Sequence, residues 1–140
     1  MKATVQWTGN VSFKAESETG HTVQMDGPAD QGGENLGPRP MEMLLMGMGG
    51  CASFDVMSML NKGRQDVVSC VAELSAERAD AVPAVFTHIH LKFIVTGNQL
   101  KDAQVKRAVS LSAEKYCSAS IMMEKAGVEV THSYVVEEAS

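Results

Sequence analysis

The stretch RPMEMLLMGMGGCASFDVMSMLNKG, residues 39–63, decides the fold. Its apolar side chains recur every three to four residues, which predicts a long, mostly buried helix. Pro40 suits a first helical turn, and Glu42 complements the positive end of the helix dipole. Lys62 and Gly63 supply a cation and a left-handed stop at the other end. The apolar positions are Met41, Leu44, Leu45, Met48, Ala52, Val56, Met59 and Leu60.

Three glycines, Gly47, Gly49 and Gly50, interrupt the predicted helix just before Cys51. Each costs about 1 kcal/mol relative to alanine in a helix interior. Two interpretations account for such a loss. Either another backbone packs very close to the helix, or the helix kinks beside the cysteine.

The segment before the helix alternates apolar and polar residues. Residues 3–7 and 11–15 predict a hairpin, and residues 21–25 a third strand that extends it as a meander. Residues 26–40 are rich in Gly, Pro, Asp and Asn, which predicts a long loop. Loops of this length without their own structure are usually functional or disordered.

The segment after the helix predicts strands at residues 67–78 and 87–96, the first with Val68, Cys70, Ala72 and Leu74 on one face. A helix is predicted over residues 100–116, a short one over 118–125, and a last strand over 128–136. This order of elements indicates an α+β fold. We expect residues 1–140 to form a single domain.

Composition excludes several classes of protein. The chain has 140 residues, 44% of them apolar, and a net charge of −5, which argues against disorder and against a nucleic-acid partner. The apolar run at residues 41–48 is interrupted by Glu42, so we expect no membrane-spanning helix and no membrane partner. Without a predicted signal peptide, the expected location is the cytoplasm.

Three cysteines fit neither a disulfide framework nor a four-ligand zinc site. Cys51 follows the glycines on the long helix, and Cys117 ends the second helix. A cysteine reacts as its thiolate, which needs a cation or a helix dipole to lower its pKa. Buried structural thiols are nonetheless the commoner case for each cysteine alone, and Cys70 is predicted to be one.

The run of residues 39–51, together with Tyr116-Cys117-Ser118-Ala119-Ser120, resembles the OsmC/Ohr family of osmotically induced and organic-hydroperoxide-resistance proteins, and within it most nearly the OsmC-like YhfA branch. The order of elements is similar over nearly the whole chain. The resemblance implies an OsmC-like α+β fold, with antiparallel sheets wrapped around two long central helices in an intertwined homodimer.

The resemblance also implies a thiol peroxidase, a peroxiredoxin-type oxidoreductase active in oxidative stress defence, with no cofactor or metal. In such enzymes the cysteine matching Cys51 attacks an organic hydroperoxide to give a sulfenic acid. The cysteine matching Cys117 then forms a disulfide with it, and a dithiol reductant restores both thiols. A glutamate and an arginine assist, for which this chain offers Glu42 and Arg39.

The chain departs from the family pattern at the charged groups. The family glutamate directly follows the proline, whereas here Met41 takes that place. The family arginine comes from the N-terminal strands, where this chain has Lys2 and Lys14, and Ser118 replaces a frequent proline. The alternative is therefore a non-catalytic OsmC-like protein that is stress-associated or binds a small molecule.

Two further features have competing interpretations. His88 and His90 share a strand face with Lys92, a spacing that suits two ligands of a metal, but a solvated polar face is the commoner case. Asp55, one turn beyond Cys51, would oppose ionisation of the thiol if it pointed there. We expect Asp55 to cap or pair elsewhere.

Overall fold

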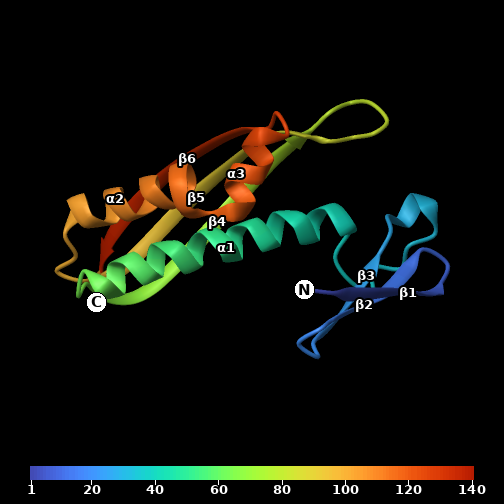
Figure 1. Cartoon of the computed structure of the whole chain (residues 1–140), viewed down its shortest axis with the longest axis horizontal. Coiled ribbons are helices and arrows are strands. Elements are labelled where there is room, and N and C mark those ends of the chain that lie inside the picture. Colours follow the sequence, from blue (N-terminus) through green and yellow to red (C-terminus); the bar gives the residue numbers. More distant parts are fainter. The chain divides into compact units, whose positions relative to one another are not determined.

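The computed structural model covers Met1 to Ser140 and divides into two compact units, Met1–Leu44 and Leu45–Ser140. The first unit contains an antiparallel sheet with the order β1-β2-β3 (Figure 1). Its strands are β1 (Ala3–Gly9), β2 (Ser12–Ser17) and β3 (Thr22–Asp26), which confirms the predicted meander. A single domain over residues 1–140 stays a prediction.

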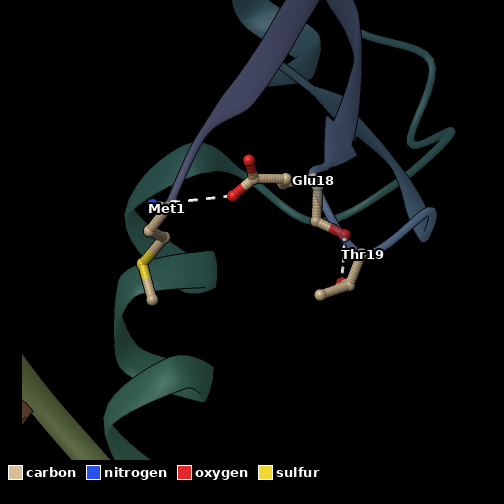
Figure 2. A network of polar contacts seen from close by, with 4 residues as sticks. Met1, Glu18 and Thr19 are labelled. Atoms are coloured by element: carbon tan, nitrogen blue, oxygen red, sulfur yellow. Dashed lines mark hydrogen bonds and ion pairs between the residues drawn. The ribbon is translucent and has the colours of Figure 1, made fainter.

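One end of this sheet, beside the start of β1, carries the only ion pair of the chain. The amino group of Met1 lies 3.5 Å from the Glu18 carboxylate, beside a hydrogen bond of 2.9 Å between the Ser17 and Thr19 hydroxyls (Figure 2). All four residues surround the turn that joins β2 to β3. Because the paired groups are exposed, this ion pair contributes little to stability.

The loop after β3 is ordered around one buried carboxylate. Asp26 accepts hydrogen bonds from the Ser12 hydroxyl at 2.8 Å and from its neighbour Gly27 N–H at 2.9 Å. Its other oxygen accepts the N–H groups of Glu34 at 2.8 Å and Leu36 at 3.1 Å. The Asp26 carboxylate thus accepts loop N–H groups that would otherwise bond within a helix or a sheet. The one regular turn of the loop is η1 (Ala29–Gln31).

The deciding stretch forms α1 (Pro40–Lys62), within one residue of the prediction at either end. Its stop differs from the prediction: the left-handed residue is Arg64, with φ 56°, and not Gly63. A side chain at Gly63 would meet the end of the flexible Gln104 side chain, which would have to move aside. The buried residues of α1 are Met48, Gly49, Ala52, Val56 and Leu60.

Helix α1 is long and apolar enough to cross a membrane, with a mean hydropathy of 1.4 over its best window. Residues 41–48 alone are too short for a span, as expected, but the whole helix Pro40–Lys62 is long enough. The helix instead packs in the core of a globular protein, with Met48 and Val56 fully buried. Packing, and not composition, thus distinguishes a core helix from a membrane-spanning helix.

The second unit contains the sheet β4-β5-β6, with strands β4 (Asp66–Arg78), β5 (Phe86–Asn98) and β6 (Glu129–Glu138). Strands β4 and β5 pair antiparallel, but β5 and β6 pair parallel. The expectation of antiparallel sheets is therefore wrong for this sheet. The helices between β5 and β6 form the crossover that a parallel pair requires (Figure 1).

The crossover has three parts, where one helix over residues 100–116 was predicted before the short one. They are α2 (Asp102–Leu111), the π-helical turn η2 (Ser112–Tyr116) and α3 (Ser118–Lys125). The expected second long helix is therefore only 10 residues of regular α-helix. Helix α3 has the predicted bounds.

The core lies between the helices and the inner face of the second sheet. Ile89, Leu91 and Phe93 of β5 are fully buried. Val68 does not join the inner face: it sits at a register shift in β4 and is 63% exposed. A β-bulge turns its side chain outward and explains the difference.

The glycines of α1 divide into two kinds. A methyl group at Gly49 would lie 2.7 Å from Leu74 of β4, so close packing accounts for this glycine. Gly47 and Gly50 face open space. Within this chain, the close-packing interpretation therefore holds for Gly49 alone.

Candidate active site

The second unit brings Cys51, Asp55 and Cys117 together. The two sulfurs and a carboxylate oxygen all lie within 4.8 Å of one another. Cys51 and Asp55 are four residues apart on α1 and therefore share a helix face. Cys117 comes from the crossover, between η2 and α3. Two thiols that are 66 residues apart in the chain thus meet at one place.

Two successive hydrogen bonds connect the Cys117 segment to α1 through Ser112. The hydroxyl of the buried Ser112 donates to the Ala52 carbonyl at 3.0 Å, which joins η2 to the residue after Cys51. The Cys117 N–H in turn donates to the Ser112 carbonyl at 2.8 Å. The first residue of the π-helical turn is therefore bonded to α1, and the turn ends at the second cysteine. Such turns often occur at functional sites.

Cys117 also begins α3. Its backbone is extended, and its sulfur accepts the Ser120 N–H at 3.4 Å. The thiol thus occupies the N-cap position, which an oxygen-bearing side chain usually fills. This contact fixes the direction of the sulfur.

The two thiols differ in their environment. Cys117 is fully buried, whereas Cys51 is half-buried. Burial raises the pKa of the Cys117 thiol, the adjacent Ser120 opposes this shift, and the neighbouring Cys51 raises the pKa further. Cys51 is therefore the more accessible thiol, and Cys117 is held in its neutral form.

Asp55 is part of the site, and the expectation that it pairs elsewhere is wrong. Burial raises the pKa of its carboxyl group. Its Oδ2 atom is buried and has no hydrogen-bond partner, and the same is true of the Ser120 hydroxyl. These are the only two such side-chain atoms in the chain, and both belong to residues next to the thiols.

A groove of about 830 Å³ runs between α1 and α2 and reaches Asp55. Its walls combine apolar side chains with cations, including Lys62 and Arg107. Met59, Leu111 and Tyr116 supply much of the rest of the lining. Asp55 therefore belongs both to the thiol cluster and to an open groove.

Arg39 and Glu42 lie in the first unit and make local contacts there. The Glu42 carboxylate accepts the Arg39 N–H at 2.9 Å, which is half of a capping box at the start of α1. The Arg39 guanidinium donates to Asn35 and to the Gly37 carbonyl, each at 3.2 Å. These contacts give both residues a structural role at the helix start.

The other candidate residues of the second unit lie apart from the cluster. His90 contacts the hydroxyls of Thr131 at 2.7 Å and Ser133 at 2.8 Å, and His88 contacts Thr131 at 2.9 Å. The two histidines belong to a hydrogen-bonded polar face of the sheet, and no third metal ligand joins them. Cys70 is half-buried on β4, and burial raises its pKa.

Sequence reasoning missed the roles of Ser112, Ser120 and Asp55. The spacing of Asp55 from Cys51 was sufficient to place the two on one helix face. Ser112 and Ser120 offered no comparable signal, because a π-helical turn changes the phase of every side chain that follows it.

Comparisons with known proteins agree with this architecture. The family model described as OsmC-like protein matches residues 32–133. Protein YhfA of Escherichia coli (strain K12) is 55% identical over 136 residues, covering 97% of this chain and 98% of its own.

Solved structures are similar over the whole chain. A hypothetical protein from Aquifex aeolicus VF5 has a TM-score of 0.85 at 27% identity, covering 99% of this chain and 97% of its own. An organic hydroperoxide resistance protein OsmC from Legionella pneumophila has a TM-score of 0.69 at 16% identity, covering 95% and 94%. The last likeness shows the fold alone. With the family model and the YhfA relative both matching most of its length, the chain belongs to the OsmC-like protein family.

Proposed function

We propose that this protein is a cytoplasmic thiol peroxidase that reduces organic hydroperoxides. The observation that carries the proposal is the approach of Cys51 and Cys117 within 4.8 Å. Two free thiols at this separation are placed to form a disulfide after a small adjustment. Membership of a family that includes organic hydroperoxide resistance proteins supports the same chemistry.

In the first step the Cys51 thiolate attacks the distal peroxide oxygen. The O–O bond breaks, Cys51 becomes a sulfenic acid, and the alkoxide takes a proton and leaves as an alcohol. The Cys117 thiol then displaces water from the sulfenic acid, and a disulfide forms. A dithiol reductant donates two electrons and two protons to restore both thiols. The greater exposure of Cys51 supports this division of roles.

The groove between α1 and α2 supplies room for the organic part of the substrate. Its apolar side chains, Met59 and Leu111 among them, suit a hydrocarbon group. Its inner end reaches Asp55, which lies within 4.8 Å of both sulfurs. A bulky hydroperoxide is therefore a better fit than hydrogen peroxide.

Arg39 and Glu42 remain proposed helpers of the thiol. Glu42→Gln separates the two roles of this residue, since glutamine also completes a capping box. If the Glu42 charge assists catalysis, Glu42→Gln slows peroxide reduction while thermal stability stays at the wild-type level. If Glu42 only caps α1, the rate is unchanged, and Glu42→Ala lowers stability by about 1 kcal/mol.

We also propose a homodimer that packs on α1. One face of this helix is apolar and open: Met46 is 51% exposed and Phe54 is 74% exposed, with Gly47 and Gly50 between them. Glycines between large apolar residues let a second helix approach closely. Phe54→Asp is expected to shift the molar mass measured by light scattering from dimer to monomer, whereas Val82→Asp, at a fully exposed loop position, leaves it unchanged.

The peroxidase proposal is tested by counting thiols after one equivalent of cumene hydroperoxide. Wild type and Cys70→Ser are expected to lose both Cys51 and Cys117 rapidly. Cys51→Ser is expected to lose neither, and Cys117→Ser to stop at a sulfenic acid that dimedone traps. If Cys51→Ser reacts as fast as wild type, the mechanism is wrong.

A second candidate function is a non-catalytic binding protein of the same fold. The observation in its favour is a carboxylate, Asp55, beside the thiols, with no ion pair there to stabilise a thiolate. An attacking thiolate usually has a cation or a helix N-terminus beside it. This candidate predicts no rapid loss of thiols in the same assay.

A further inference from the structure

We propose that Cys51, Asp55 and Cys117 form a zinc-binding site with one coordination position left open. The three residues supply two sulfurs and one carboxylate oxygen within 4.8 Å of one another. Zinc is borderline-soft and accepts both kinds of ligand. In tetrahedral coordination, bonds of about 2.0–2.3 Å place ligand atoms about 3.3–3.8 Å apart. The observed separations therefore need only a small contraction.

The orphaned atoms at this place give the second, independent argument. A buried carboxylate oxygen without a partner is costly, and native structures satisfy almost all such atoms. Asp55 Oδ2 is the only unpartnered buried carboxylate oxygen of the chain, and it belongs to the residue next to the two thiols. A cation bound there would supply the missing partner.

The number of ligands indicates the kind of site. Closed structural zinc sites use four protein ligands, whereas three protein ligands leave a position for water or another molecule. Asp55 also lines the groove between α1 and α2, so the open position is accessible from outside. We therefore expect a site that exchanges its metal and binds small ligands, and not a permanent structural zinc.

Zinc binding deprotonates both thiols: the ion replaces two protons, which pass to the buffer. Release of the zinc by peroxide rests on the proposed peroxidase function. A hydroperoxide and two protons convert the zinc-bound thiolates into the disulfide, an alcohol and water, and the zinc ion is released. Bound zinc would then keep the two thiols reduced until a hydroperoxide oxidises them and the zinc ion leaves.

The test uses tag-free, reduced, full-length protein titrated with zinc against a chromophoric chelator, without peroxide. Wild type is expected to bind a single zinc ion per chain. Cobalt in place of zinc is expected to show thiolate-to-metal charge-transfer absorption. Cys51→Ser, Cys117→Ser and Asp55→Ala are each expected to weaken binding by at least about tenfold, the loss caused by removing even an outer ligand partner.

Matched controls separate this site from other groups. Cys70→Ser and the double variant His88→Ala/His90→Ala are expected to bind zinc as wild type does. Circular dichroism establishes that each variant is folded before titration. Absence of zinc binding in folded wild type, or unchanged affinity in Asp55→Ala, would overturn the proposal.

The peroxide assay distinguishes this inference from the proposed function. Chelator-treated protein that reduces cumene hydroperoxide but binds no zinc would leave the peroxidase intact and refute the metal site. Protein that binds zinc at these three residues but does not react with peroxide would support the metal site and refute the peroxidase.

Discussion

Two aspartates show how differently this chain treats its acidic groups. Asp26 accepts four hydrogen bonds, which lower the pKa of its carboxyl group to about 2, with the N–H groups of Glu34 and Leu36 as the largest causes. Asp55 has a buried oxygen with no partner, and burial raises its pKa. The satisfied carboxylate organises a loop. The unsatisfied one lies beside two thiols, where a ligand could complete it.

The largest expected effect is the loss of the satisfied carboxylate. Asp26→Ala leaves the Ser12 hydroxyl and three backbone N–H groups without their acceptor. We expect this variant to be less stable than the variants at Ser12, Ser69, Asp55 and Ser120 described below. Urea unfolding followed by the fluorescence of Trp7, the single tryptophan, which lies on β1, measures the change. Wild-type stability in Asp26→Ala would remove the contrast between the two aspartates.

The pH dependence of stability sharpens the same contrast. Because the folded-state pKa of Asp26 is about 2, below its usual 3.8, its ionised form stabilises the fold above about pH 4. That contribution is lost as the pH falls through 3.8 toward 2. We therefore expect the stability gap between wild type and Asp26→Asn to be constant above pH 4 and to close below it. A gap that persists at pH 2 would contradict this assignment.

Ser12 provides a smaller version of the first test. Its hydroxyl is buried and donates to Asp26 at 2.8 Å, so Ser12→Ala is expected to cost about 1.5–3 kcal/mol, as for hydrogen bonds to charged groups. The matched control is Ser69→Ala on the exposed face of β4, expected within about 0.5 kcal/mol of wild type. Equal effects of the two substitutions would contradict the role of Asp26 as acceptor.

The smallest expected effect is at Asp55 and Ser120, whose buried polar atoms have no hydrogen-bond partner. In metal-free protein, Ser120→Ala removes a buried hydroxyl that has no oxygen or nitrogen partner and only the weakly accepting Cys117 sulfur beside it, so we expect a change within about 0.5 kcal/mol. Asp55→Asn is likewise expected to keep or raise the stability of the metal-free protein. Thermal unfolding in the presence of a chelator measures both. A large loss in either variant would mean that its polar group has a structural partner.

The sequence predicted most elements of the fold because their periodicity is strong. Helix α1 and strands β4 and β5 were found within about two residues of their ends, since buried residues recur at regular spacing. The break in the second helix was not found, because the π-helical turn at residues 112–116 contains no Pro or Gly that would mark it. The parallel pairing of β6 depends on the crossover, which local patterns do not encode.

The site was predicted only in part. The resemblance singled out Cys51 and Cys117, and the structure places them close together. Asp55 was misjudged because sequence spacing gives a helix face but not what lies opposite it. The order of the loop around Asp26 was equally hidden, since its four hydrogen bonds span up to 14 residues.

The cap formed by Cys117 links chemistry to mechanics. Its sulfur accepts the hydrogen bond of the Ser120 N–H and so holds the first turn of α3 in place. Whatever draws that sulfur toward another atom loosens the turn, and α3 leads directly into the edge strand β6. The bonding state of the Cys117 sulfur is therefore coupled to the order of the first turn of α3.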